Sequence, residues 1–282
     1  MQGAWGTRRN FSFWVQRFRS ESWSFLERCV KAVAFTYVHL SEICRNRGVW
    51  GRKPLLRAIY GHFYELIRQN IASVPGMTVE LGSGIASIKD WIPDCVTTDL
   101  FPNARIDRRE NAYALSFPDA SVSNLILLDV FHHLQFPGTA LRQFERVVAP
   151  RGRVILFEPG LGILGRLVYG LFHREPLGLR RSIAWYAPNG FDPDQAAYYA
   201  AQGNPWRIFV RNEFSDWLGP WKIHRLQQLP ELAYIASGGF TRPQLYPGRM
   251  LSVIRGIEKQ AARWPTIFAT RLLVVLEKRY ES

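Results

Sequence analysis

Between residues 77 and 157, short apolar runs alternate with stretches of helical periodicity, and this alternation constrains the fold more than any other feature of the chain. The apolar runs are Met77–Leu81, Val96–Leu100, Asn124–Leu128 and Arg153–Phe157. Between the last two, Thr139–Val148 has the apolar spacing of a helix and ends at an Ala-Pro-Arg-Gly turn. Because strands that alternate with helices form right-handed βαβ units, the sequence predicts a parallel sheet covered by helices on both faces.

The residues before this region have a different pattern. Apolar residues recur every three to four positions over Phe11–Leu40 and again over Leu55–Ile71, which indicates helices. We therefore expect an N-terminal helical region over residues 1–72, followed by the sheet domain over residues 73–282.

The second half of the chain is expected to add two insertions to the sheet domain, at about 160–220 and 230–266. The first is rich in Gly, Pro and aromatic residues and is typical of a lid. The second contains Gly248–Trp264, which has the pattern of a basic amphipathic helix. Trp221–Leu229 and Thr270–Lys278 resemble two closing strands.

A glycine-rich turn follows the first predicted strand. Glu80 stands two residues before Gly82-Ser83-Gly84, and Asp99 ends the next predicted strand. Glycines allow a tight turn and close approach to a ligand, and a following helix would offer free N–H groups. An acid at the end of the second strand suits ribose hydroxyls. A nicotinamide site is less well matched, since the last position of its fingerprint is Ser87.

From residue 77 to 159 the chain resembles class I S-adenosylmethionine (SAM)-dependent methyltransferases. Five segments carry the resemblance in order: Val79–Gly84, Thr97–Leu100, Asn111–Asp119, Leu127–Leu134 and Ala149–Val154. The resemblance implies a Rossmann-like α/β fold with a mostly parallel seven-stranded sheet, SAM as cofactor and S-adenosylhomocysteine as product. The departures are Ala86 for a third glycine, Asn111 for an Asp, Arg151 for a Gly and Ser123-Asn124 for a more usual Phe-Asp.

The resemblance also implies which residues bind the cofactor. Glu80 would hold the ammonium group, N–H groups near Ser83 and Gly84 the carboxylate, Asp99 the ribose and Asn111 the adenine. The full expected set is Glu80, Gly82, Ser83, Gly84, Asp99, Leu100, Asn111, Ala112, Asp129 and Val130. No metal site is predicted, because the three cysteines form no CxxC pair and no ligand cluster.

The candidates for a catalytic base are two adjacent histidines. His132 and His133 follow the third predicted strand, and imidazole has a pKa suited to proton removal near neutral pH. The alternative is that one or both pack structurally. His173 and Glu175 form a second pair within the first insertion, with a local polar cluster as the alternative.

The net charge of +13 lies on the flanks, since residues 71–160 hold eight Lys and Arg against ten Asp and Glu. The flanks also hold the aromatic residues that could wall an apolar acceptor pocket: Trp14, Trp23, Trp185, Tyr186, Tyr198, Tyr199 and Trp206. We expect a small-molecule, saccharide or lipid-linked acceptor, methylated at oxygen, in a cytoplasmic protein that could also dock on an anionic membrane surface.

Two other functions remain open at this point. One is a SAM-binding or scaffold protein without catalysis. The other, ranked lower, is an RNA methyltransferase, since no RNA-binding module accompanies the basic residues. After the third predicted strand the chain has Asp129-Val130-Phe131-His132. Enzymes of this superfamily that methylate planar amino groups have an Asn/Asp-Pro-Pro-Tyr/Phe string at this place. Its absence disfavours DNA adenine and glutamine as acceptors.

Overall fold

The computed structural model describes residues 39–195 and 198–280. The chain divides into two units, Met1–Arg45 and Asn46–Ser282, and the sheet belongs to the second. Of the first unit, residues 39–45 are described and are helical. Most of the helical pattern predicted over Phe11–Leu40 therefore lies outside the described residues, as do Trp14 and Trp23.

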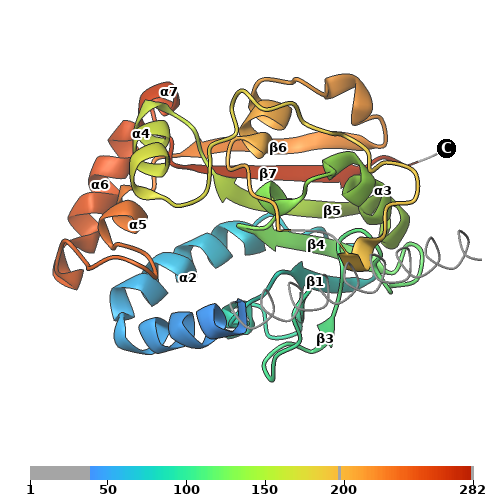
Figure 1. Cartoon of the computed structure of the whole chain (residues 1–282). Coiled ribbons are helices and arrows are strands. Elements are labelled where there is room, and N and C mark those ends of the chain that lie inside the picture. The colour runs from blue at the N-terminus through green and yellow to red at the C-terminus, as the bar shows by residue number, and fades with distance from the viewer. Residues whose placement is uncertain (1–38, 196–197, 281–282) are drawn as a thin grey trace, which may run out of the picture. The chain divides into compact units, whose positions relative to one another are not determined.

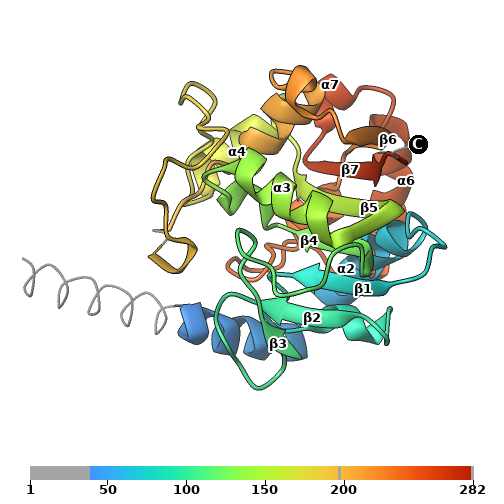
Figure 2. The ribbon, with the colours of Figure 1, turned by 90° about the vertical axis from the view of Figure 1, so that its right-hand side faces the viewer.

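The predicted α/β architecture is confirmed by a single seven-stranded sheet (Figures 1 and 2). Its strands are β1 (Met77–Leu81), β2 (Val96–Asp99), β3 (Arg108–Arg109), β4 (Val122–Leu128), β5 (Val148–Pro159), β6 (Trp221–Leu229) and β7 (Arg271–Lys278). They lie in the order β3-β2-β1-β4-β5-β7-β6. β7 runs antiparallel to both β5 and β6, and the other pairs are parallel.

Helices precede the first strand and form several of the connections between the later strands. They are α2 (Pro54–Arg68), α3 (Pro137–Val147), α4 (Ile163–Phe172), α5 (Leu232–Ala236), α6 (Leu251–Ala261) and α7 (Pro265–Phe268). α2 begins with proline, which suits the first turn because its missing N–H would have no helical partner there. The predicted helix Gly248–Trp264 is shorter than expected, because a 3₁₀ turn precedes α6 and Trp264 lies beyond it.

Alternation along the strands creates two apolar cores. Leu125 and Leu127 of β4 face one side, where α3 and part of the first insertion pack with Phe144 and Trp185. Ile126 faces the other side, where α2 contributes Phe63. Residues two apart on a strand share a face, so each buried strand supplies both cores.

Two local predictions are wrong. The glycine-rich turn is followed by a four-residue 3₁₀ helix, Ser87–Asp90, and a full helix is absent from this described segment. Residues 149–152 belong to β5 and do not form a separate turn. Arg151 has φ +63° within β5, a conformation that glycine adopts more easily, and the register between β4 and β5 shifts nearby.

Among the described residues, no helix combines the length and apolar character needed to cross a membrane.

Candidate active site

The glycine-rich turn connects β1 to the 3₁₀ helix at the carboxyl end of the sheet. Gly82 has φ +70°, and a Cβ at this position would overlap the side chain of Val130. Gly84 has φ +50°, and a Cβ built there has no neighbour within 4 Å. Gly82 is therefore required for packing against the loop after β4, whereas Gly84 borders open space that a ligand could fill.

Glu80 is the one predicted cofactor residue whose side chain is both buried and incompletely paired. It is 2% exposed, and its Oε2 has no hydrogen-bond partner within the described part of the chain. Burial raises the pKa of Glu80 to about 7, and the negative charge of Asp99 adds to this effect. A cationic ligand would stabilise the ionised carboxylate, so Glu80 fits the ammonium group of SAM.

Asp99 is held by the backbone at the end of β2. Gly84 N–H donates to its Oδ2 at 3.0 Å, and Phe101 N–H donates to its Oδ1 at 3.0 Å. Ser83 N–H donates to Thr98 O at 2.8 Å. The two N–H groups predicted for the cofactor carboxylate are thus engaged within the protein, and they fix the turn and the Asp99 carboxylate instead.

The predicted adenine side of the site lies on the segment after β3. Asn111 Nδ2 donates to Pro193 O at 2.9 Å, which ties this segment to the first insertion. Its Oδ1 accepts from Tyr113 N–H. Leu100 O accepts from Arg109, and Leu100 and Ala112 are partly buried. Asn111 therefore ties the first insertion to the segment that is expected to receive adenine.

Asp129 ends β4 and forms an ion pair that the sequence did not predict. Both guanidinium NH groups of Arg271, on β7, donate to its carboxylate, the NH2 contact at 2.9 Å. Arg271 is 1% exposed and lies 4.3 Å from the ring centre of Tyr234. Burial alone would lower the pKa of Arg271, but Asp129 raises it above the ordinary value. The structure thus gives Asp129 a role in holding the end of β4.

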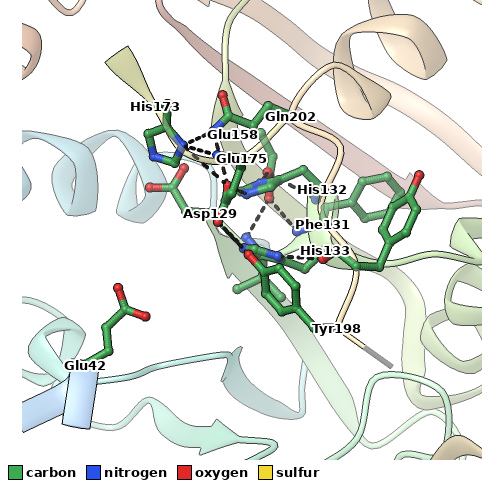
Figure 3. A network of polar contacts seen from close by, with 12 residues as sticks. Glu42, Asp129, Phe131, His132, His133, Glu158, His173, Glu175, Tyr198 and Gln202 are labelled. Carbon is green, nitrogen blue, oxygen red and sulfur yellow. Dashed lines mark hydrogen bonds and ion pairs between the residues drawn. The ribbon is translucent and has the colours of Figure 1, made fainter. Parts of the chain in front are cut away.

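His132 is buried between two carboxylates (Figure 3). Its Nδ1 lies 2.6 Å from Glu158 Oε2, and its Nε2 lies 3.3 Å from Glu175 Oε2. Glu158 also accepts the N–H groups of Val130 and Phe131. Burial alone would lower the pKa of His132, but the two carboxylates raise it to about 10. His132 is therefore protonated at neutral pH and cannot accept a proton from an acceptor hydroxyl.

His133 has the opposite electrostatic environment. Burial and the neighbouring charge of His132 lower its pKa to about 4, so the ring is neutral at pH 7. Its Nδ1 lies 2.9 Å from Tyr199 O, which requires the proton on Nδ1 and leaves a lone pair on Nε2. Of the two predicted candidates, His133 has the protonation state of a base.

The second predicted pair, His173 and Glu175, lies beside His132 and His133. Glu175 lies 20% exposed beside both histidines, and His132 and His133 hold its pKa below the ordinary range against the effect of burial. Tyr198 donates to its Oε1 at 2.9 Å, and Gln202 donates to His173 Nδ1 at 2.6 Å. Figure 3 shows these side chains converging from the β4 loop and the first insertion.

The predicted aromatic wall divides between two roles. Trp185 lies in the core, stacked on Phe214 with ring centres 4.5 Å apart. Trp206 lies beneath Arg166. Tyr198 and Tyr199 contact the histidine cluster (His132, His133, His173 and Glu175), through a hydroxyl and a carbonyl respectively.

A cavity of about 300 Å³ adjoins the far side of the glycine-rich turn. It is lined by Arg47, Trp50, Gly51, Ile85, Ala86, Ser87, Asp90 and Arg105. Two arginines and one aspartate make its lining positively charged.

Comparison with known proteins identifies the central segment. A family model described as a methyltransferase domain matches residues 80–156, which run from Glu80 through β5 and include the glycine-rich turn, Asp99 and Asp129. This segment is a class I SAM-dependent methyltransferase domain. Its cofactor is SAM, and the buried, unpartnered Glu80 oxygen together with the open space at Gly84 fits that ligand. A search of curated protein sequences finds no match.

Solved structures with a similar fold include other SAM-dependent methyltransferases. A possible histamine N-methyltransferase from Thermotoga maritima is 13% identical with a TM-score of 0.47, covering 86% of this chain and 99% of its own. A methyltransferase from Archaeoglobus fulgidus is 10% identical with a TM-score of 0.46, covering 79% and 94%. One from Mesorhizobium loti is 12% identical with a TM-score of 0.42, covering 76% and 96%. At these identities, the similarities say nothing about the acceptor of this methyltransferase domain.

Proposed function

We propose that the chain binds SAM at the carboxyl ends of β1 and β2 and transfers its methyl group to an oxygen atom of a lipid-linked or other amphipathic small acceptor. The observation that carries the proposal is Glu80 Oε2, a buried carboxylate oxygen without a partner in the described residues. An unpaired buried acceptor destabilises a protein unless a ligand pairs with it. The ammonium group of SAM supplies that partner.

The residues around the turn would orient the cofactor. Asp99, fixed by the N–H groups of Gly84 and Phe101, is placed to accept from ribose hydroxyls. Bound SAM supplies a methyl group activated by its sulfonium, which an acceptor lone pair displaces in line. The chain contributes alignment of the two reactants and exclusion of water.

An oxygen acceptor must also lose a proton, and the histidine cluster supports this part of the proposal. His133 Nε2 carries a lone pair at neutral pH and its side chain is 31% exposed. Glu175 beside it would stabilise the imidazolium formed on proton transfer. His132 holds Glu175 in place through its Nε2.

The acceptor class is supported by an exposed apolar surface made by α4, α6, α7 and the loop before α6. Its members more than half exposed are Ile163, Leu167, Leu171, Phe172, Leu245, Val253, Ile257 and Trp264. α4 contacts α7, and Figure 1 shows α4, α6 and α7 at one end of the sheet. Exposed apolar side chains gathered on neighbouring elements are typical of an interaction site.

The charge around this apolar surface is positive. Its exposed basic residues are Arg166, Arg174, Arg180, Arg242, Arg249, Lys259 and Arg263. The acids within 160–180 and 240–269 are Glu175, which faces the histidines, and Glu258, which is buried. Apolar side chains beside basic residues on short helices suit the interface of an anionic bilayer. His173 and Glu175 directly follow α4, so an acceptor held in the bilayer would lie next to the histidine cluster.

Two experiments test the cofactor and catalytic parts. Calorimetric titration of the full chain with S-adenosylhomocysteine should show saturable binding that Glu80→Gln and Asp99→Ala weaken. A donor-turnover assay over lipid-linked and water-soluble hydroxyl acceptors should show transfer that His133→Gln reduces. Binding without turnover on any acceptor would favour a non-catalytic SAM-binding protein, and no binding would refute the proposal.

Flotation with vesicles tests the membrane part. The full chain should float with vesicles that contain phosphatidylglycerol and should float much less with phosphatidylcholine alone. Leu171→Ser and Val253→Ser should reduce flotation, because both residues are exposed on the apolar surface. Leu226→Ser is the matched control, since Leu226 is also exposed but lies on β6. Equal flotation of all three variants, or none by the wild type, would refute membrane docking.

A further inference from the structure

Three side chains from two separate parts of the sequence place polar atoms close together beyond the carboxyl end of β4. Nitrogen atoms of His132 and His133 and a carboxylate oxygen of Glu175 all lie within 4.8 Å of one another. The two histidines come from the loop after β4, whereas Glu175 comes from the first insertion. Figure 3 shows the carboxyl group of Glu175 beside both imidazole rings.

The outer hydrogen bonds of the histidines have the pattern of metal ligands. A histidine that binds a metal through one nitrogen usually donates the other N–H to a carboxylate or a backbone carbonyl. His132 Nδ1 pairs with Glu158 Oε2 at 2.6 Å, and His133 Nδ1 pairs with Tyr199 O at 2.9 Å. Both Nε2 atoms are thereby left to face Glu175.

The distances between the inner atoms also match a metal site. With bonds of about 2.0–2.1 Å, the ligand atoms of a tetrahedral zinc lie about 3.3–3.4 Å apart. Glu175 Oε2 lies 3.3 Å from His132 Nε2, and Glu175 Oε1 lies 3.7 Å from His133 Nε2. A cation that displaced the proton of His132 Nε2 could therefore bridge His132 and Glu175 in place of their hydrogen bond.

The carboxylate of Glu175 is itself oriented by two donors. Tyr198 OH donates to Oε1 at 2.9 Å, and Gln202 Nε2 donates to Oε2 at 3.2 Å. Gln202 is 1% exposed, so this support is rigid. Hydrogen bonds that hold the ligand side chains in position are typical of metal sites and are not expected of a chance cluster.

We infer that His132, His133 and Glu175 bind one divalent transition-metal cation, with Zn²⁺ the best match to two imidazoles and one carboxylate. Three protein ligands leave a fourth position open, which is the arrangement of catalytic zinc sites. His133 and Glu175 are 31% and 20% exposed, so an acceptor could reach that position. Its role rests on the proposed function: the cation would coordinate the acceptor hydroxyl and lower its pKa, so that the proton could leave to solvent water, and His133 would then serve as a ligand in place of a base.

Cobalt is a suitable probe, because tetrahedral Co²⁺ absorbs visible light and is displaced by Zn²⁺. The chelator-treated full chain should take up one Co²⁺ saturably, with visible absorption that Zn²⁺ abolishes. His133→Gln and Glu175→Gln should each weaken Co²⁺ binding at least tenfold, about the loss seen for outer-contact mutations alone. His224→Gln is the matched control, since His224 lies on β6 and pairs with Glu277.

Two readouts keep the inference separate from the proposed function. Thermal unfolding shows whether each variant is folded. Tyr198→Phe removes the hydroxyl that donates to Glu175, so this milder variant should weaken Co²⁺ binding less than the ligand variants do. Titration with S-adenosylhomocysteine on the same preparations reports the cofactor site alone. No saturable Co²⁺ uptake by the wild type, or uptake unchanged in folded His133→Gln and Glu175→Gln, would overturn the metal site even where cofactor binding is intact.

Discussion

Glu80 should make cofactor binding depend on pH in a way that can be calculated. Its folded-state pKa is raised to about 7 because the carboxyl group is buried. An ammonium pairs with the ionised carboxylate, so at lower pH the proton must leave before the ligand binds. Affinity should therefore fall about tenfold for each pH unit below 7, which corresponds to about 1.4 kcal/mol per unit.

The assay is calorimetric titration with S-adenosylhomocysteine, which keeps the ammonium group and does not react. At pH 6 the dissociation constant should be about tenfold higher than its plateau above pH 7, and at pH 5 about a hundredfold higher. Glu80→Gln should bind weakly and show no such slope, since an amide does not titrate. Asp99→Asn should bind more weakly at every pH and shift the curve toward lower pH, because the negative charge of Asp99 helps to raise the pKa of Glu80.

A thermal unfolding curve at each pH serves as the control for loss of the folded state. The reasoning fails if wild-type affinity is constant between pH 5 and 7 while the protein stays folded. It also fails if Glu80→Gln keeps the wild-type slope, because another group would then carry the titration.

Three further predictions concern stability. Gly82→Ala should destabilise the protein by about 2 kcal/mol or more, because Gly82 has a positive φ and a Cβ there would overlap Val130. Val130→Ala should recover part of this loss, which denaturant unfolding of the double variant measures. Purely additive effects of the two substitutions would contradict the contact. Asp129→Asn should cost about 3 kcal/mol because it leaves the buried Arg271 charge unpaired, and a wild-type melting temperature would show that the pair is not structural. Arg151→Gly should raise the free energy of unfolding, measured in urea, by about 0.5–1 kcal/mol, since Arg151 has φ +63°. A lower free energy of unfolding would show that the contact of Arg151 with the Tyr280 ring outweighs the backbone strain.

The central strands of the sheet were largely predictable because they are buried on both faces. β1 and β6 coincide with the predicted Met77–Leu81 and Trp221–Leu229, and β7 begins one residue inside its prediction. The buried strands, unlike the largely exposed β6, are continuous apolar runs bounded by turn residues, which a single sequence displays. β3 could not be predicted, since it consists of two exposed arginines, Arg108 and Arg109, whose pairing with β2 depends on the position of the neighbouring strand.

The site was predictable where it is local in sequence. The glycine-rich turn and Asp99 lie at the carboxyl ends of β1 and β2, which are consecutive in the chain and pair in parallel, so the two features come together. Glu158 and Arg271 were missed, although each is a charged residue next to the apolar run of a buried strand, and a buried charge needs a partner. The joining of His132 with Glu175 depends on how the first insertion folds back over β4, which no periodicity encodes.

The ion pair between Asp129 and Arg271 also orders the assembly of the protein. The two residues are 142 positions apart, and β7, which carries the arginine, is the last strand in the chain yet lies between β5 and β6. During synthesis the loop after β4 therefore emerges long before the cation that holds it. Until β7 inserts, Asp129 has no guanidinium partner and β6 has no neighbour through which to join the sheet. The loop after β4 should accordingly be among the last parts to mature, and a nascent chain that stops before β7 should expose it to degradation.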